Sequence, residues 1–215
     1  MGTSERKERE RLSRYNSILD AAEEVFFEKG LHQTTVEEIA KKAELSKGTI
    51  YLYFKCKELI YIGINNRASS VLRQLFERVL KMKKSGMDRM IEIGKAYYKF
   101  SQKYPYYFRL MTFVDHMSAE ILGKIKDDPI VVEAHDNGQA VLGVIAEILR
   151  QGMADGTVRK DIDPLKTAVQ TWAQSNGVIT MEKNMKCHYK TRDLGFDNLY
   201  PDYLVMMRNS LKAEN

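Results

Sequence analysis

Residues 35–54, TVEEIAKKAELSKGTIYLYF, constrain the fold of this chain more than any other stretch. Thr35 can cap a helix with its hydroxyl group, and Glu38 three positions later completes the capping-box pattern. After a tight turn that ends at Leu45, Ser46 can cap a second helix in the same way. The segment therefore predicts two short helices joined by a tight turn.

The second of these helices has an outward side that is not typical of plain solvent exposure. At roughly 100° per residue, Ile50 and Phe54 share one side of the helix and must face the core. The opposite side and its flanks then carry Lys47, Gly48, Thr49, Tyr51, Leu52 and Tyr53. An exposed leucine among tyrosines and a lysine indicates a binding surface.

A helix pair with such a face is the helix-turn-helix arrangement, in which the second helix enters the major groove of DNA. Lys47 can donate to guanine or to a phosphate, and Thr49 can reach a base edge. Leu52 can pack on a thymine methyl group, whereas the tyrosine hydroxyls suit phosphate oxygens. Gly48 lets the helix backbone come close to the duplex.

The neighbouring elements extend the helical pattern. Apolar residues recur at spacings of three and four over residues 12–26, and Gly30 is the expected end of this first helix. Lys57 begins a long helix, where its charge and the free N–H groups predict a phosphate site. Thr34 or Thr35 is expected to provide a similar site at the start of the preceding helix.

Residues 18–59 resemble the DNA-binding head of TetR-type regulators. The likeness rests on the first helix ending at Gly30, on Thr-Val-Glu-Glu-Ile-Ala, and on Ser-Lys-Gly-Thr-Ile-Tyr followed by Tyr-Phe and then Lys57. This resemblance implies DNA contacts at Thr34, Thr35, Ser46, Lys47, Thr49, Tyr51, Tyr53 and Lys57, and the helix face adds Gly48 and Leu52. The family usually has an aromatic residue where Leu52 stands, which affects only the base preference there. For Tyr51 and Tyr53, the alternative is packing within the head.

The chain is expected to be all-α, with an N-terminal three-helix helix-turn-helix head (residues 1–58). A long helix joins this head to a C-terminal helical ligand-binding and dimerisation body (residues 59–215). Helices are predicted over 58–80, 87–104, 106–122, 129–153, 164–183 and 198–212. In the body, only the segment 156–164 resembles the family's sequence pattern.

The body is predicted to bind a small apolar or aromatic effector. Aromatic residues concentrate between Tyr97 and Phe113, with methionines beside them, and such side chains suit an apolar cavity. The expected lining is Tyr97, Phe100, Tyr104, Tyr107, Phe108, Met111 and Asp115, with Trp172 and Asn176 from a later helix. The alternative is an ordinary core, because aromatic stripes at helical spacing are usually buried.

The last two predicted helices carry apolar stripes that each must bury a face. In the resembled family such helices form a four-helix bundle with a second copy, which implies a homodimer on palindromic double-stranded operator DNA. We expect DNA and effector to prefer different states of the body, so that effector binding releases the operator. This mechanism describes a repressor, and an activator remains the alternative.

Several other classes of protein and site have no support in the sequence. No apolar run is long enough to cross a bilayer, the N-terminus does not resemble a secretory signal, and a cytoplasmic location is expected. Cys56 and Cys187 indicate neither a disulfide framework nor zinc, and no metal, cofactor or enzyme active site is expected. The net charge of +5 is compatible with DNA binding without proving it. An all-helical carrier for lipophilic molecules is the main alternative function.

A basic run follows the head and has two interpretations. It comprises Arg67, Arg73, Arg78, Lys81, Lys83, Lys84 and Arg89. These side chains either bind phosphate or, as we favour, form a solvated face whose apolar stems cover a neighbouring helix.

Overall fold

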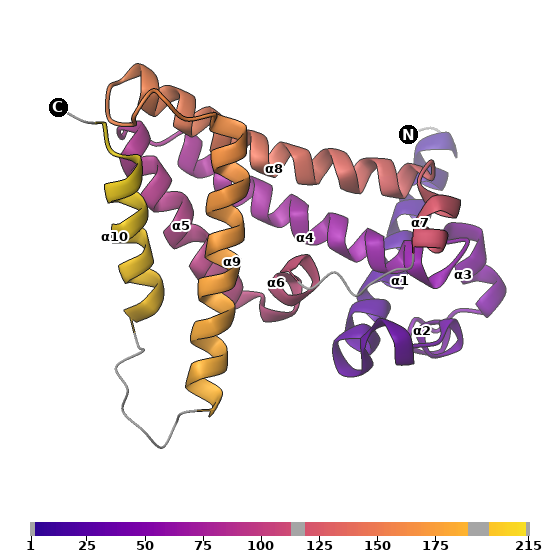
Figure 1. The fold of residues 1–215 in the computed structure, drawn as a ribbon. Coiled ribbons are helices and arrows are strands. Elements are labelled where there is room, and N and C mark those ends of the chain that lie inside the picture. The colour runs from indigo at the N-terminus through magenta and orange to yellow at the C-terminus, as the bar shows by residue number, and fades with distance from the viewer. Residues whose placement is uncertain (1–2, 113–118, 189–197, 214–215) are drawn as a thin grey trace. The chain divides into compact units, whose positions relative to one another are not determined.

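The computed structural model describes residues 3–112, 119–188 and 198–213, which form ten α-helices and no strand (Figure 1). The predicted all-α fold is therefore confirmed. The helices are α1 (Thr3–Gln33), α2 (Val36–Lys42), α3 (Lys47–Tyr53), α4 (Lys57–Leu80), α5 (Gly86–Lys103), α6 (Pro105–Thr112), α7 (Ala119–Ile125), α8 (Pro129–Ala154), α9 (Pro164–His188) and α10 (Leu199–Leu211). The predicted helix over 106–122 corresponds to α6 and α7, and residues 113–118 lie outside the described part.

The chain divides into two compact units. We call residues 1–68 with 113–135 the head unit, and residues 69–112 with 136–215 the body unit. Helices α4 and α8 each begin in the head unit and end in the body unit. The predicted domain boundary between residues 58 and 59 falls at the start of α4, whereas the head unit includes α4 as far as residue 68, since Leu59 and Ile60 are buried in its core.

The head unit is built on the long helix α1. Its predicted apolar stripe is buried from Ile18 through Phe26. Gly30 interrupts the helix with φ 76° and ψ 170°, a conformation that glycine adopts without a side-chain clash, as expected for the end of the first helix. On α4, the missing side chain of Gly63 leaves room for Tyr15 and Phe54, whose rings stack with centroids 4.9 Å apart.

The body unit has its core around α5. Met87, Met90, Ile93, Tyr97 and Phe100 follow each other at spacings of three or four, and all five are buried. They pack with apolar residues of α4, α8, α9 and α10. In Figure 1, α9 and α10 lie side by side within this unit.

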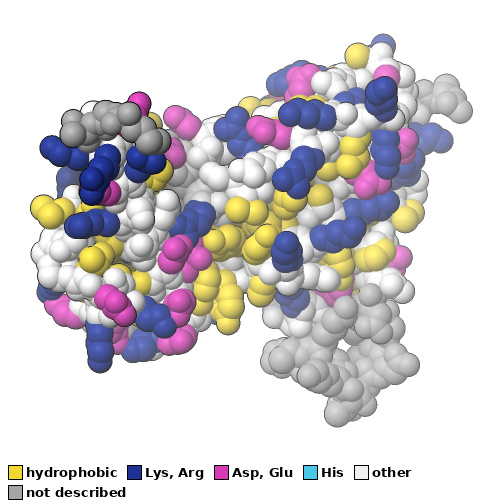
Figure 2. Space-filling view, turned by 180° about the vertical axis from the view of Figure 1, so that it is seen from behind, with side chains coloured by type: hydrophobic (Ala, Val, Ile, Leu, Met, Phe, Trp, Pro, Cys, Tyr) yellow, Lys and Arg dark blue, Asp and Glu magenta, His cyan; other side chains and the backbone are white. Residues whose placement is uncertain are grey.

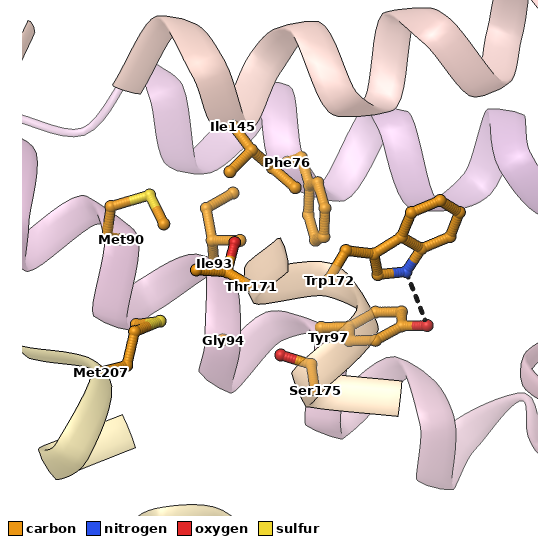
Figure 3. Close-up of a pocket in the computed structure, with 10 residues that line it drawn as sticks. All are labelled: Phe76, Met90, Ile93, Gly94, Tyr97, Ile145, Thr171, Trp172, Ser175 and Met207. Atoms are coloured by element: carbon orange, nitrogen blue, oxygen red, sulfur yellow. Dashed lines mark hydrogen bonds between the residues drawn. The ribbon is translucent and has the colours of Figure 1, made fainter. Parts of the chain in front are cut away.

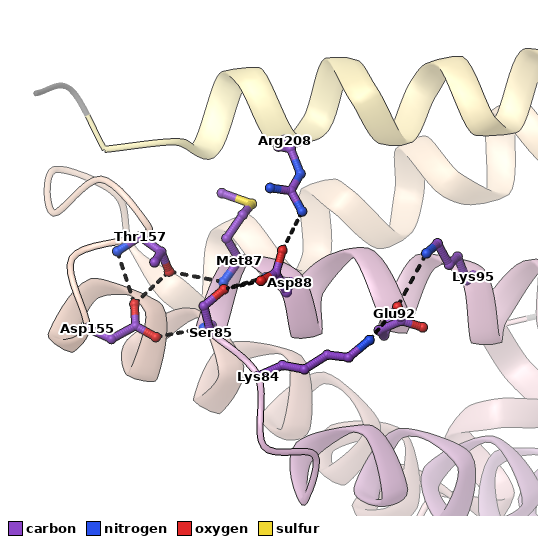
Figure 4. A network of polar contacts seen from close by, with 10 residues as sticks. Lys84, Ser85, Met87, Asp88, Glu92, Lys95, Asp155, Thr157 and Arg208 are labelled. Carbon is purple, nitrogen blue, oxygen red and sulfur yellow. Dashed lines mark hydrogen bonds and ion pairs between the residues drawn. The ribbon is translucent and has the colours of Figure 1, made fainter.

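The start of α5 is held by residues distant in sequence (Figure 4). Ser85 accepts from the backbone N–H of Asp88 at 3.1 Å, in the usual manner of an N-cap residue. The Asp155 carboxylate accepts from Gly86 N at 2.7 Å, and the Thr157 hydroxyl accepts from Met87 N at 3.1 Å. The free N–H groups at the helix start are therefore satisfied by Ser85 and by the loop after α8.

The segment 156–164, whose sequence resembles the family pattern, also connects α8 with α10. Val158 is fully buried and packs on Gly152, where a Cβ atom would lie 2.5 Å from the Val158 Cγ2. Arg159 donates its backbone N–H to Leu211 O at 3.0 Å. With the hydrogen bond from Met87 N to Thr157, the segment thus contacts three helices of the body unit, α5, α8 and α10.

Candidate nucleic-acid interface and ligand cavity

The start of α2 has the predicted capping box. The Thr35 hydroxyl accepts from Glu38 N at 3.3 Å, and the Glu38 carboxylate accepts from Thr35 N at 2.9 Å. Glu38 also forms an ion pair with Lys29 of α1. This ion pair and the backbone hydrogen bond lower the pKa of Glu38 to about 2. Thr35 remains exposed at the capped start of α2.

Thr34 is not placed as its predicted role requires. Its side chain is 1% exposed, and its hydroxyl donates to Gly30 O at 2.8 Å. The hydroxyl closes the turn that follows α1, so it has no access to a phosphate. The Thr34 side chain therefore has a structural role, and the prediction that it contacts DNA is corrected.

Helix α3 shows the predicted inward and outward sides. Ile50 and Phe54 are fully buried, whereas Leu52 is 84% exposed and Tyr51 43% exposed. Tyr53 is half-buried. The four other predicted contact residues of this region lie on the exposed or half-exposed side, namely Ser46, Lys47, Gly48 and Thr49.

The cap of α3 involves two of the predicted contact residues. Thr49 donates its backbone N–H to the Ser46 hydroxyl at 3.0 Å, and the two hydroxyl oxygens are 2.8 Å apart. A hydroxyl group can donate one hydrogen bond and accept two, so both groups retain capacity for a further partner.

Three lysines near α3 each have an oxygen partner within the head unit. Lys47 forms an ion pair with Glu37, and the hydrogen bond to that carboxylate raises the pKa of Lys47. Lys55 lies 3.0 Å from the carboxylate of Asp128 at the start of α8. Lys57 donates to Thr34 O at 2.8 Å, which holds the start of α4 against the turn before α2. An ammonium group has three donors, so each lysine can still approach an anion.

On the face seen in Figure 2, cationic and anionic side chains are mixed. In the basic run after the head, Arg67 pairs with Asp20 and Glu23, and Lys84 pairs with Glu92. Arg73 pairs with Glu77, and Arg89 donates to Leu80 O and to the Gln151 side chain. These four members of the run thus have partners within the protein. Arg78, Lys81, Lys83 and Lys84 are exposed.

The body unit has a small cavity of about 20 Å³ (Figure 3). Of the nine predicted effector contacts, Tyr97 and Trp172 line it. The Trp172 indole N–H donates to the Tyr97 hydroxyl at 3.0 Å, and that hydroxyl donates to Asn176 Oδ1 at 2.5 Å. Burial raises the pKa of Tyr97, so the group is a neutral hydrogen-bonding phenol.

None of the other described effector candidates lines the cavity, although Asn176 is hydrogen-bonded to Tyr97 beside it. Phe100 and Phe108 are buried in the core, and Tyr104, Tyr107 and Met111 pack partly buried against it. Asp115 lies outside the described residues. The remaining lining residues were not predicted from the sequence and are Phe76, Met90, Ile93, Gly94, Ile145, Thr171, Ser175 and Met207. The helical spacing of Met90, Ile93 and Tyr97 was the signal for part of this set.

Helices α9 and α10 present an apolar outer face. Leu165, Val169, Met181, Val205 and Met206 are between 46% and 69% exposed. A groove of about 520 Å³ runs between the two helices and is lined by Gln170, Gln174, Gly177, Val178, Tyr203 and Met206 among others. Exposed apolar side chains concentrated on two neighbouring helices are typical of an interaction surface.

Metal-binding and membrane-spanning features can be assessed only in the described part of the chain. No group of three or more His, Cys, Asp or Glu side chains there is arranged to hold a metal ion. Within the same residues, no helix has the length and hydropathy needed to span a membrane. Cys56 is a half-buried thiol, and the side chain of Cys187 lies outside the described part.

Comparison with known families gives two matches. The model for "Bacterial regulatory proteins, tetR family" matches residues 18–62, and that for "Tetracyclin repressor-like, C-terminal domain" matches residues 90–198. The fatty acid metabolism regulator protein of Bacillus subtilis is 28% identical over 70% of this chain and 73% of its own length. The repressor KstR2 of Mycolicibacterium smegmatis is 25% identical, with 70% of each chain covered.

Solved structures share the fold at low sequence identity. The regulator FadR of Bacillus subtilis, in complex with stearoyl-CoA, has a TM-score of 0.72 and 21% identity and covers 92% of this chain and 99% of its own. The ketosteroid regulator KstR2 of Mycobacterium tuberculosis has a TM-score of 0.63 and 17% identity, with 94% and 96% covered.

Proposed function

Because the chain belongs to the TetR family of bacterial regulatory proteins, we propose that it is a ligand-responsive transcriptional repressor that binds a palindromic operator as a dimer. The outward face of α3 carries this proposal. Leu52 is 84% exposed on a helix that is capped at its start and anchored by buried residues on its inner side. A rigid helix that holds a leucine in solvent is suited to contact with a thymine methyl in the major groove.

The proposed DNA contacts follow from exposure. Leu52, Lys47 and Tyr51 would face the bases and the nearest phosphates, with Gly48 allowing close approach. Thr35, Ser46, Thr49, Tyr53 and Lys57 are proposed to contact the backbone around the two helix starts and the end of α3.

The proposed effector has a long apolar part, as in an acyl thioester. Ligand cavities usually measure about 300–1,000 Å³, so a cavity of about 20 Å³ has to open before it can hold such a molecule. Met90 and Met207 line the cavity, and methionine side chains adapt their shape readily. The relative FadR has been solved with stearoyl-CoA, which supports this class of ligand. The hydroxyl of Tyr97, with Asn176 and Trp172, would orient a polar group of the effector.

The second copy is proposed to pack on the outer face of α9 and α10. The exposed apolar residues and the groove between these helices supply the surface that a four-helix bundle would bury. The protein is proposed to act in the cytoplasm, where operator DNA is found, and to have no catalytic activity.

Binding to a duplex selected from random DNA by the purified protein tests the proposal. We expect saturable, salt-dependent binding to a palindrome, weakened roughly tenfold by Leu52→Ala because this variant cannot make the apolar base contact. Leu122→Ala on α7, where the leucine is 40% exposed, is the matched control and should bind as the wild type does. Binding that shows no sequence preference and is equal in all three proteins would refute the proposal.

Effector release is measured on the same complex. Stearoyl-CoA should dissociate the protein from the palindrome, whereas coenzyme A alone should not. If stearoyl-CoA binds the protein tightly and operator affinity is unchanged, the proposed coupling between the two sites is wrong.

A further inference from the structure

The first part of α1 extends beyond the core of the head unit. The first buried side chain of α1 is Ile18, and all residues over 4–14 are exposed. We call residues 4–14 the N-terminal extension. At about 1.5 Å per residue, its eleven residues form a helix roughly 16 Å long. Isolated helices of this length are marginal in water, so the extension owes its helical form to continuity with the rest of α1.

The extension carries an excess of positive charge. It contains Arg6, Lys7, Arg9, Arg11 and Arg14, against the three acidic residues Glu5, Glu8 and Glu10. Arg6 pairs with Glu10, and Arg11 pairs with Glu8. Among the described residues, Lys7 and Arg14 form neither a hydrogen bond nor an ion pair. These two side chains are available to an external anion.

The cations are not evenly distributed around the helix. Lys7, Arg11 and Arg14 follow each other at spacings of four and three, which puts them on one face. The same spacing continues to Ile18, so this basic stripe lies on the side of α1 that packs on the head core farther along. Arg9 lies on the opposite face, and Arg6 lies between the two faces.

The basic stripe begins next to the proposed DNA interface. Tyr15, which directly follows Arg14, stacks on Phe54 at the C-terminal end of α3. Lys55 and Lys57 follow Phe54 in sequence, so the stripe continues a set of cations that starts at the end of α3.

We propose that the N-terminal extension binds the phosphate backbone of the duplex flanking each operator half-site, through Lys7 and Arg14 with Arg11 beside them. This inference rests on the proposed operator binding and extends its footprint. The extension would touch phosphates, so it adds affinity on any flanking sequence and no base preference.

Two double variants and two duplexes test this proposal. The test variant is Lys7→Gln with Arg14→Gln, and the control is Arg6→Gln with Arg9→Gln, which removes the same charge from the other faces. Each protein is titrated with the minimal selected palindrome and with the same palindrome lengthened by one helical turn at both ends. Both variants change only exposed side chains, and circular dichroism verifies that the fold is unchanged.

We expect the wild type and the control to bind the long duplex more tightly than the short one, and the test variant to show no such preference. On the long duplex, the slope of log affinity against log salt should fall by about 0.9 for each phosphate that the variant no longer neutralises, or up to about 3.6 for four cations in the dimer. If both variants lose the same affinity for the long duplex, the loss reflects net charge alone and the proposal is overturned. A wild type that binds the two duplexes equally would also overturn it. If the wild type binds neither duplex, the proposed function itself fails.

Discussion

Substitution of Gly86 by alanine should destabilise the body unit. Gly86 begins α5 where it crosses α8, and a Cβ atom there would overlap the backbone of Gly152 and lie 3.1 Å from Ile148 O. Backbone atoms cannot rotate away as a flexible side chain can, so α5 and α8 would have to separate. Overpacking of this kind costs about 1–3 kcal/mol. For a chain of this size, Tm falls by about 2–4 °C per kcal/mol, so a cost near 2 kcal/mol lowers Tm by about 4–8 °C.

The matched control is Gly143→Ala on α8. A Cβ atom at Gly143 would meet nothing within 4 Å, and alanine favours a helix interior over glycine by roughly 0.5–1 kcal/mol. The same substitution should therefore raise Tm at residue 143 and lower it at residue 86. Thermal unfolding is followed by circular dichroism at one fixed protein concentration, because association shifts the apparent stability. Shifts of the same sign, or an unchanged Tm for Gly86→Ala, would refute this account of the helix crossing.

Three further outcomes follow from the site and its supports. Glu37→Gln should release Lys47 and raise affinity for random DNA, so the ratio of operator to random binding in a competition assay should fall. Met206→Glu should give a monomer by analytical ultracentrifugation that no longer binds the operator, whereas Met82→Glu, at a residue outside the α9 and α10 face, should remain dimeric. The pKa of Glu38 is about 2 in the folded protein, held down first by its ion pair with the α1 lysine. The ionised Glu38 therefore stabilises the folded protein above pH 4.5, the pKa of the unfolded side chain, and this stabilisation is lost as the pH falls from 4.5 towards 2. Thermal unfolding of Glu38→Gln should show a Tm that depends less on pH over that range.

Local signals made the head unit predictable from sequence. The capping box at Thr35 and the cap at Ser46 involve residues within three positions of each other, so their geometry is set by the helix itself. The burial of Thr34 was not evident from the sequence: its hydroxyl donates to Gly30 O, which gives the side chain a structural role. Sequence resemblance aligned the residue with DNA contacts but carried no information on its burial.

The body was predictable as helices and much less as a cavity. Aromatic residues at helical spacing fit a core as well as a pocket: Tyr97, Phe100 and Phe108 are all buried, but only Tyr97 lines the cavity. The cavity also needs Phe76 from α4 and Met207 from α10, which meet α5 only through tertiary packing. Such a set has no signature in one stretch of sequence.

The internal partners of the lysines near α3 bear on how the protein searches a chromosome. In the proposed complex, Lys47 would exchange the Glu37 carboxylate for a phosphate, and an exposed ion pair of this kind is individually weak. On random DNA only phosphates would be contacted, so this exchange would add little to the affinity and the protein would dissociate quickly. An operator would add the proposed base contacts of α3, and the protein would stay bound longer only there. If the proposed contacts form, Glu37 would thus shorten the time that the protein spends on the many wrong sites of a genome.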